Sequence, residues 1–370
     1  MKILYDHQSF SGARYGGVAR YFYDLMHNLK YEQGVEVELA LQFSNNDYLK
    51  NEDIKKVIPF SFFLGYGRTN MMFSHINRLN SALHLLRNNF DVFHPTYFND
   101  YFFTFLSKKK PFVITHHDVI PEKFSTQYAC LDGFDKYHKQ KVLEKASKII
   151  AVSENTKQDI LEIFKIEPEK VEVIYHSTHF ATFKPNDSIK INVPARYLLY
   201  VGNRDNYKNF DVYVEAIAPL LKKQDDLHLI CAGNGKFTPT EQELFKSLNV
   251  EKRIIHHEIE NDDVLYQLYN HALAFVYPSL YEGFGIPILE AFACECPVIL
   301  SNRSCFPEVG QDAAIYFNPI DKEQIAHEVE KVIDNQALRR ELIEKGKKRL
   351  QDFSPSITAS KTLKVYQSIL

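Results

Sequence analysis

The feature that most constrains this chain is a repeated alternation between short apolar runs and stretches with helical periodicity. Such alternation is typical of βαβ units that build a parallel sheet. The strands expected in the first half are Lys2–Tyr5, Glu36–Leu41, Val92–His94, Phe112–Thr115, Lys148–Val152 and Val171–Ile174. The helices expected there are Val18–Leu29, Ser74–Leu86, Asp135–Ala146 and Glu154–Phe164.

The periodicity stops between Tyr175 and Arg196, in a polar segment with two prolines that is typical of a linker. A second alternation follows. Its expected strands are Tyr197–Val201, His228–Ala232, Ile254–His256, Ala274–Tyr277 and Pro297–Leu300. Its expected helices are Asp211–Lys222, Thr240–Leu248, Asp262–Tyr269, Ile286–Cys294, Gln324–Asp334 and a charged helix through Leu350.

The two halves carry similar numbers of strands, which favours two doubly wound α/β domains over one very large sheet. We place an N-terminal Rossmann-like domain at 1–180, a linker at 181–196 and a second Rossmann-like domain at 197–354. Ligands of such folds bind at the carboxyl ends of the strands. Those ends are therefore where functional residues are sought.

Composition limits the partners of the chain. With 370 residues and a net charge of -3, it lacks the basic balance of a nucleic-acid-binding protein. The five scattered cysteines are consistent with buried thiols in a reducing compartment, so we expect a cytoplasmic protein. No run reaches the roughly 20 apolar residues that span a bilayer. A peripheral contact is left open, because Lys108–Lys110 could meet anionic lipid, although a solvated run is the preferred explanation of these lysines.

The first strand leads through a loop into Gly16 and Gly17, just before a helix. Adjacent glycines there let backbone N–H groups approach an anion, but a plain tight turn explains them equally well. The loop after strand Tyr197–Val201 carries Arg204 and Lys208. These two cations could converge on a diphosphate, or could be ordinary cations of a solvated loop.

The most informative segment follows strand Ala274–Tyr277. Glu282 lies in the loop before a helix, and Glu290 lies in that helix, one turn in. Gly283 and Gly285 predict a turn, and Pro287 suits the first helical turn. Two carboxylates near a helix start suit the recognition of ribose and hexose hydroxyls. The alternative is a capped helix with surface acids.

Two further strand ends carry candidate site residues. His116 and His117 follow strand Phe112–Thr115, where one histidine should face a ligand, although such a histidine is more often structural. The polar loop Ser301–Val309 could close around a phosphate or be an ordinary loop.

No two aspartates stand two positions apart, so the Asp-x-Asp clamp of many metal-dependent sugar transferases is absent. No metal or other cofactor is expected.

The segments NRDNYKN and SLYEGFGIPILEAFACECPVILSNRSCFPEVGQDAA together resemble glycosyltransferase family four, whose members are retaining enzymes of GT-B architecture. The spacing Glu282-x7-Glu290 matches the two-glutamate motif of that family. YDHQSFSGARYGGVARYFYDL, VITHHDVIPEKF and KIIAVSENTKQDI also resemble its segments. The resemblance implies two Rossmann-like domains that face a central cleft, with a terminal helix, 355–370, that crosses back to the N-terminal domain.

The resemblance also implies roles for individual residues. Arg204 and Lys208 would bind the donor diphosphate, Glu290 the ribose and Glu282 the transferred sugar. His117 matches an active-site histidine of the N-terminal domain, and Gly16–Gly17 match the loop that meets phosphate and acceptor. The further donor contacts implied are Glu258, Ile259, Gly283, Phe284, Gly285 and Ile286. One departure is Tyr175-His176-Ser177, where the family often has Asn-Gly.

The function that follows is transfer of a hexose, with mannose favoured, from a GDP- or UDP-linked donor. The expected acceptor is a hydroxyl of a glycan or lipid-linked acceptor in surface-polysaccharide, lipopolysaccharide or O-antigen synthesis. The prediction of mannose rests only on the opening segment YDHQSF…YGGVARYF. The alternatives are a GT-B nucleotide-sugar 2-epimerase and a donor-binding partner subunit without turnover. The expected location is the cytoplasm, or a peripheral position on the inner face of the cytoplasmic membrane.

Overall fold

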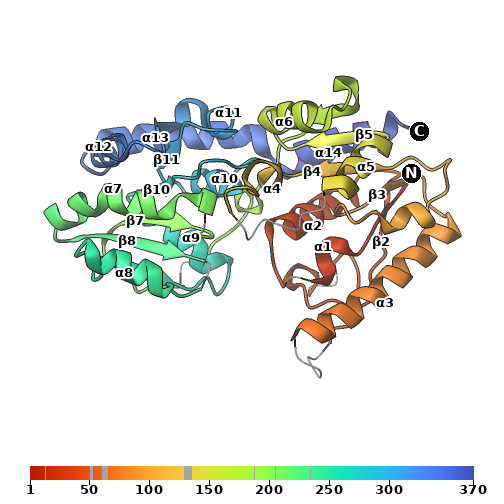
Figure 1. Ribbon diagram of the computed structural model, residues 1–370, viewed down its shortest axis with the longest axis horizontal. Helices are drawn as coiled ribbons and strands as arrows, with labels where there is room; N and C mark the ends of the chain where they lie inside the picture. The colour runs from red at the N-terminus through yellow and green to blue at the C-terminus, as the bar shows by residue number, and fades with distance from the viewer. Residues whose placement is uncertain are drawn as a thin grey trace. The chain divides into compact units, whose positions relative to one another are not determined.

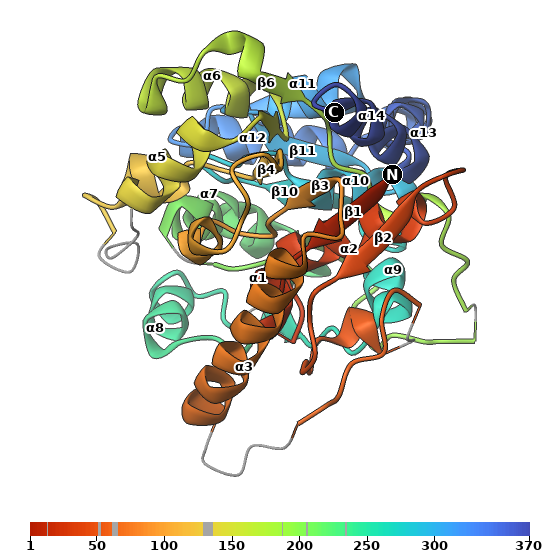
Figure 2. The same ribbon diagram turned by 90° about the vertical axis from the view of Figure 1, so that its right-hand side faces the viewer.

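The computed structural model describes residues 1–12, 14–50, 53–60, 66–128, 136–186, 188–204, 206–233 and 235–370. The chain forms two compact units (Figures 1 and 2). Unit 1 comprises Met1–Ser177 together with Pro355–Leu370, and unit 2 comprises Thr178–Ser354. The N-terminal domain was predicted to end at residue 180, three residues later.

Among its described residues, unit 1 contains only parallel strands. They are β1 (Lys2–Tyr5), β2 (Glu36–Leu39), β3 (Val92–His94), β4 (Val113–His116), β5 (Lys148–Ala151) and β6 (Val171–Val173). Two sheets, β2-β1-β3 and β4-β5-β6, are joined by a parallel bridge between Phe93 and Phe112. The strand order is thus 2-1-3-4-5-6, a doubly wound arrangement with helices on both faces.

The helices of unit 1 cover this sheet. They are α1 (Gln8–Ser11), α2 (Gly17–Leu29), α3 (Tyr66–Arg87), α4 (Ile120–Phe124), α5 (Lys136–Lys145), α6 (Glu154–Phe164) and α14 (Pro355–Gln367), with 3₁₀ turns η1 (Asp47–Leu49), η2 (Asp100–Thr104) and η4 (Pro168–Lys170). Helix α14 packs against α2, and Ala359, Val365 and Tyr366 enter the hydrophobic core of the unit. The last segment of the chain is therefore part of the first unit.

Unit 2 has a six-stranded parallel sheet. Its strands are β7 (Arg196–Val201), β8 (Leu227–Ala232), β9 (Ile254–His257), β10 (Ala274–Tyr277), β11 (Val298–Ser301) and β12 (Ala314–Phe317). The order β9-β8-β7-β10-β11-β12 is that of a Rossmann fold. The direction of winding reverses between β7 and β10, and a ligand site is expected at the carboxyl ends of these two strands.

The helices of unit 2 are α7 (Phe210–Lys223), α8 (Pro239–Ser247), α9 (Asp262–Asn270), α10 (Ile286–Ala293), α11 (Phe306–Gly310), α12 (Lys322–Ile333) and α13 (Gln336–Leu350). The 3₁₀ turns are η5 (His179–Ala181), η6 (Asn206–Lys208), η7 (Gln311–Ala313) and η8 (Gln351–Phe353). Side chains of Thr238, Asn261 and Asp321 cap α8, α9 and α12, which fixes where these helices begin.

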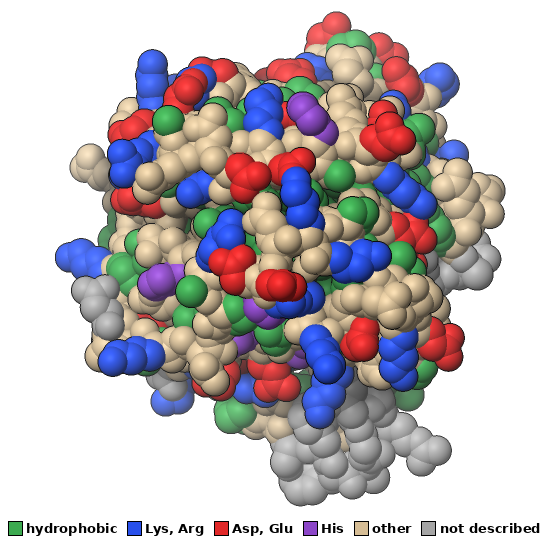
Figure 3. Space-filling view, turned by 90° about the vertical axis from the view of Figure 1, so that its left-hand side faces the viewer, with side chains coloured by type: hydrophobic (Ala, Val, Ile, Leu, Met, Phe, Trp, Pro, Cys, Tyr) green, Lys and Arg blue, Asp and Glu red, His purple; other side chains and the backbone are tan. Residues whose placement is uncertain are grey.

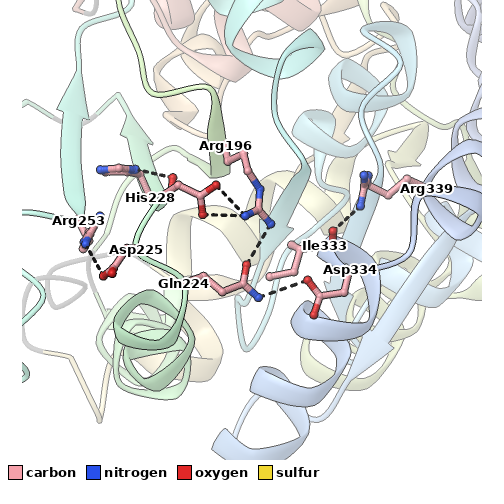
Figure 4. A network of polar contacts seen from close by, with 9 residues as sticks. Arg196, Gln224, Asp225, His228, Arg253, Ile333, Asp334 and Arg339 are labelled. Carbon is pink, nitrogen blue, oxygen red and sulfur yellow. Dashed lines mark hydrogen bonds and ion pairs between the residues drawn. The ribbon is translucent and has the colours of Figure 1, made fainter.

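A network of polar contacts stabilises the end of unit 2 at which β7 begins (Figure 4). Arg196 donates two hydrogen bonds to the Asp226 carboxylate, at 2.7 and 2.9 Å, and one to Gln224. Gln224 in turn donates to Asp334 at 3.3 Å, at the end of α12. The carboxyl ends of the strands, where a ligand site is expected, lie at the opposite end of the sheet.

The structure differs from the sequence-based expectation in a few elements. Strand β12 was not predicted. The short helices α1, α4 and α11 were not predicted either, because four or five residues are too few to show a helical repeat. Helix α3 begins at Tyr66 and not at Ser74. The loop predicted at Ser301–Val309 ends in α11. The expected helix Asp135–Ala146 begins outside the described residues, which resume at Lys136.

Candidate active site

Two loops meet at the carboxyl ends of β7 and β10 in unit 2. The backbone N–H of Leu280 donates to the Tyr207 carbonyl at 2.8 Å. The Asn209 side chain donates to the Pro278 carbonyl at 3.2 Å and to the Pro319 carbonyl at 2.7 Å. Residues far apart in sequence are thereby held side by side at the point where the winding reverses.

Lys208 and Glu282 form an ion pair between these loops. The Lys208 ammonium lies 2.6 Å from Glu282 Oε1 and 3.4 Å from the Tyr277 hydroxyl. The two side chains are only 13% and 10% exposed. Burial alone would lower the pKa of Lys208, but the Glu282 carboxylate and the Tyr207 side chain together outweigh it and raise that pKa. Lys208 therefore carries its charge at neutral pH in a site that is largely withdrawn from water.

The loop around Glu282 is fixed by the loop that follows β11. The backbone N–H of Glu282 donates to Ser304 Oγ at 3.1 Å. Cys305 Sγ lies 3.3 and 3.1 Å from the carbonyl oxygens of Glu282 and Phe284, and its single S–H donates to this pair. The predicted loop after β11 therefore supports the glutamate, a role that its polar composition did not reveal.

Helix α10 begins directly after this loop. Gly285 precedes it with φ +91, and an added Cβ would lie 3.0 Å from Ile288 Cδ1 and 3.3 Å from Phe306 Cε1. Only glycine fits this position without strain. No side chain among the described residues caps α10, and Pro287 occupies its first turn. Its N-terminal N–H groups and the positive end of its dipole suit a bound anion.

Glu290 lies on α10 and has a different partner. The Tyr269 hydroxyl of α9 donates to Glu290 Oε2 at 3.0 Å. Burial raises the pKa of Tyr269 well above its usual value, and the nearby Glu290 carboxylate raises it further, so this hydroxyl keeps its proton. Tyr269 thus orients the carboxylate. Sequence inspection missed it because it lies 21 residues from Glu290, on another helix.

Arg204 is occupied by partners within unit 2. Its side chain is 1% exposed, and its Nε donates to Glu241 Oε1 at 2.6 Å. Its two terminal nitrogens donate to the carbonyls of Gly233, Gly235 and Lys236, at 3.1–3.2 Å. These bonds occupy four of the five guanidinium N–H groups, so in this structure Arg204 holds the loop after β8. A two-pronged grip on a diphosphate would require some of them to break, and the predicted diphosphate contact stays a prediction.

That loop borders the residues expected to meet the nucleotide base. An added Cβ on Gly233 would lie 3.6 Å from the Gly202 backbone nitrogen and 3.8 Å from Ile259 Cδ1. Ile259 is 36% exposed. Glu258, also exposed, contacts Nδ1 of His257 through its carbonyl oxygen at 2.8 Å. Arg204 and Glu241 therefore position the wall beside Gly202 and Ile259, and Glu241 is a residue that the sequence did not bring to attention.

The predicted histidine of unit 1 lies against a second histidine. The rings of His117 and His176 stack with centroids 5.3 Å apart and planes 6° apart, and His117 Nδ1 lies 3.4 Å from His176 Nε2. Burial lowers the pKa of His117 to about 3, so its ring is neutral. His176 belongs to the Tyr175-His176-Ser177 departure from the family pattern. The departure from the family pattern therefore marked, in the sequence, a residue that lies beside His117.

A chain of buried polar groups connects this region to α14. Tyr21 packs edge-on against both stacked histidines, and its hydroxyl lies 3.1 Å from Thr115 Oγ1. His94 contacts Thr115 Oγ1 at 3.1 Å and the Tyr366 hydroxyl of α14 at 2.6 Å. The C-terminal helix thus supports the core beneath the predicted histidine.

Gly16 and Gly17 begin α2, the helix that carries Tyr21. Both are exposed, and a Cβ added to either would meet no atom within 4 Å. No side chain among the described residues caps α2. The start of the helix therefore leaves room for a ligand near its N–H groups.

Two family models match nearly the whole chain. The model of Glycosyltransferase Family 4 matches residues 15–179, and the model of Glycosyl transferases group 1 matches residues 184–349. The O-antigen chain mannosyltransferase RfbU of Salmonella typhimurium is 30% identical over 210 residues, which cover 56% of this chain and 57% of that protein. The chain thus matches somewhat more than half the length of this curated relative.

Solved structures show the same fold. Sucrose-phosphate synthase of Thermosynechococcus elongatus superposes with a TM-score of 0.80 at 19% identity, covering 100% of this chain and 99% of that one. HepE of Anabaena, solved in complex with UDP-glucose, superposes with a TM-score of 0.73 at 17% identity and covers 100% of both chains. The chain therefore belongs to the group 1/family 4 glycosyltransferases and has the GT-B fold.

Proposed function

We propose that this chain transfers a hexose from a nucleoside-diphosphate sugar to a hydroxyl group of a glycan or lipid-linked acceptor, with retention of anomeric configuration. The observation that carries the proposal is the largely buried Lys208–Glu282 pair at the carboxyl ends of β7 and β10, just before α10. A cation, a carboxylate and a free helix start at one place supply the groups that a sugar diphosphate requires.

The proposed donor contacts follow from this arrangement. Lys208 and the N–H groups of Gly283–Ile286 meet the diphosphate, while Glu282 accepts hydrogen bonds from sugar hydroxyls. Glu290, oriented by Tyr269, meets the ribose. Glu258 and Ile259 lie on the base side. The complex of the structural relative HepE with UDP-glucose supports a nucleotide-sugar donor.

In unit 1 the proposed substrate contacts are His117 and the backbone of Gly16 and Gly17. His117 is neutral because burial lowers its pKa to about 3, so it offers a hydrogen bond and no charge. Which of its nitrogens carries the proton is set by the contact with His176 at 3.4 Å. The departure from the family pattern at His176 is then part of the site.

The proposed chemistry needs no metal. The acceptor oxygen forms a bond to the anomeric carbon on the face from which the diphosphate leaves, while the bond between that carbon and the phosphate oxygen breaks. The acceptor proton passes to the departing phosphate. Lys208 and the α10 N-terminus stabilise the charge that develops there, and losing one such contact costs ~2.7–4 kcal/mol, a hundredfold or more in rate.

The transferred sugar and the pathway are the finer part of the proposal. Mannose is supported by RfbU, whose name gives it as an O-antigen chain mannosyltransferase. We accordingly place the chain in O-antigen or related lipopolysaccharide synthesis, in the cytoplasm at the inner face of the membrane. GDP-linked mannose is then the first donor to test, with UDP-linked sugars as the alternative.

The test is a thermal-shift screen of GDP-, UDP-, dTDP- and ADP-sugars with chelator present, because a ligand that binds the native state raises its stability. The donor that stabilises the protein is then incubated with candidate acceptors, and the anomeric configuration of the product is read by NMR. We expect a retained configuration. An inverted product would overturn the proposal, and conversion of UDP-GlcNAc alone would assign the chain to the 2-epimerases instead.

Glu290 provides a second test of the donor site. Glu290→Ala should weaken nucleotide binding by about tenfold or more, since a charge-assisted hydrogen bond to the ribose is lost. Glu295→Ala is the matched control, because Glu295 lies just beyond the same helix and is exposed. Calorimetric titration measures both, and equal affinity in the two variants would remove the ribose assignment.

A further inference from the structure

Helix α3 carries large apolar side chains on its outer side. Met72, Leu79, Leu83 and Leu86 are 42%, 65%, 53% and 60% exposed. Their spacing of seven, four and three residues places them in one stripe along the helix. Figures 1 and 2 show α3 running along the periphery of unit 1. A stripe of this kind is unusual on a helix face that meets only water.

The opposite face of α3 is buried and includes polar side chains. Asn77 is 0% exposed; its Oδ1 accepts from the backbone N–H groups of Gln42 and Phe43, at 3.2 and 2.9 Å. Ser81 is also fully buried and donates to the Ala40 carbonyl at 2.7 Å. Leu85, which is 1% exposed, and Ala82, which is 5% exposed, are also buried. The inner face therefore holds the helix to unit 1 by hydrogen bonds and by apolar packing, whereas the four side chains of the outer stripe lie outside the core.

The charges of α3 are of one sign. Its sequence includes Arg78 and Arg87 and no aspartate or glutamate. An acid that contacts the helix, Glu38 of β2, is paired with His84 at 2.7 Å and with Lys2 at 2.9 Å. By contrast, the face of the molecule in Figure 3 mixes acidic and basic side chains.

A lysine cluster adjoins the C-terminal end of α3. Lys110 donates to the carbonyl of Phe90, three residues beyond the helix, and its ammonium lies 5.2 Å from the centroid of the Phe90 ring. Lys108 and Lys109 beside it are exposed. The apolar stripe therefore ends next to a group of cations.

We infer that the outer face of α3, with Lys108 and Lys109, docks on the surface of an anionic lipid membrane. An exposed apolar stripe bordered by cations is the pattern of a helix that lies in a membrane interface. None of the helices among the described residues is long and apolar enough to cross a bilayer. The face lies at the boundary between headgroups and acyl chains, where leucines reach the acyl chains and cations meet acidic headgroups.

The test uses the full chain and vesicles of phosphatidylcholine alone or with phosphatidylglycerol. Co-sedimentation should show binding to the anionic vesicles that weakens at high salt. Leu79→Gln/Leu83→Gln should weaken it roughly tenfold or more. The matched control is Tyr31→Gln/Ile320→Gln, at residues 71% and 68% exposed, which should bind as the wild type does. Lys108→Gln/Lys109→Gln should lose about fivefold per lysine on anionic vesicles alone.

Two results would overturn the inference. One is failure of the wild type to bind anionic vesicles, or equal binding by the leucine variant. The other is self-association in light scattering that the leucine variant abolishes while vesicles bind nothing, which would assign the face to a second copy. Circular dichroism establishes that the variants are folded. The vesicle measurement requires no donor or transfer, so its failure leaves the proposed function to be judged separately.

Discussion

Lys208 and Glu282 face each other across the switch point of unit 2 and are largely withdrawn from solvent. A buried ion pair gains stability only when both partners stay in place. An incoming diphosphate brings negative charge of its own, which can replace Glu282 as the partner of Lys208. Glu282 is then free to accept hydrogen bonds from the sugar. The pair is therefore suited to exchanging partners when the donor binds.

We propose that Arg204 supports the proposed donor site through Glu241 and the loop after β8, because its nitrogens all donate within unit 2. We predict that Arg204→Met and Glu241→Gln each weaken nucleotide binding and that the double variant is no weaker than Arg204→Met. Their coupling should reach about 0.5–3 kcal/mol, the range for residues in contact. Calorimetric titration of the four proteins measures it.

The competing role for Arg204 gives a different result. If its guanidinium left Glu241 to grip the diphosphate, Glu241→Gln would leave affinity unchanged or raise it, and only Arg204→Met would weaken binding. Hydrogen exchange of the backbone around Gly233 and Gly235, measured without nucleotide, should accelerate in both variants if they act on the loop. Unchanged exchange there would contradict the positioning role.

Single residues were predictable from sequence only where their partners are signalled locally. Lys208 and Glu282 were both expected at strand ends, and parallel strands bring such ends to one edge. Glu241 lies 37 residues from Arg204 with no local signal, so the competition for the guanidinium could not be foreseen. His176 was noticed as a departure, but its stacking on His117 depends on how β4, β5 and β6 pair.

Among the elements, α10 depends most on one residue at its start. Gly285 has φ +91, and a Cβ added there would lie only 3.0 Å from Ile288 Cδ1. We predict that Gly285→Ala destabilises the protein by about 1–3 kcal/mol, because it combines left-handed strain with a close contact to Ile288. Chemical unfolding measures this. Gly12→Ala is the control, since Gly12 has φ -112 and nothing within 4 Å of an added Cβ. Equal loss in both variants would contradict the explanation.

Apolar strands were predictable even when they are short, whereas helices of four or five residues were not. Strands β1, β3 and β10 have the predicted bounds, as does α6 with its Ser153 cap. Strand β12 has four residues and no pattern that separates it from a loop. The strand order β9-β8-β7-β10-β11-β12 is set by pairings between distant residues, which no local pattern records.

At the scale of the whole molecule, buried histidines make stability depend on pH. Burial lowers the pKa of His94 and of His117 to about 3, whereas an unfolded histidine titrates near 6.5. Between these values the unfolded chain binds more protons than the folded one, so acid favours unfolding. Each histidine therefore contributes stability that is complete above about pH 6.5 and is lost as the pH falls toward 3.

We predict that the free energy of unfolding falls by roughly 1–2 kcal/mol per such histidine between pH 6.5 and pH 5. Thermal unfolding by calorimetry at both pH values measures it. His94→Gln should reduce this pH dependence, and His327→Gln, at an exposed position, should leave it unchanged. A profile that His94→Gln does not alter would show that this imidazole is not buried in its neutral form.

The account depends most on the claim that Lys208 binds a nucleoside diphosphate at the end of β7. Calorimetric titration of GDP and UDP with chelator present, into the wild type, Lys208→Ala and Lys223→Ala, tests it directly. Lys223 is the control, because its side chain is 68% exposed and pairs with Glu330. We predict that one nucleotide binds the wild type and Lys223→Ala equally, and Lys208→Ala about ten- to hundredfold more weakly. Binding of neither nucleotide, or equal affinity in all three proteins, would contradict the account.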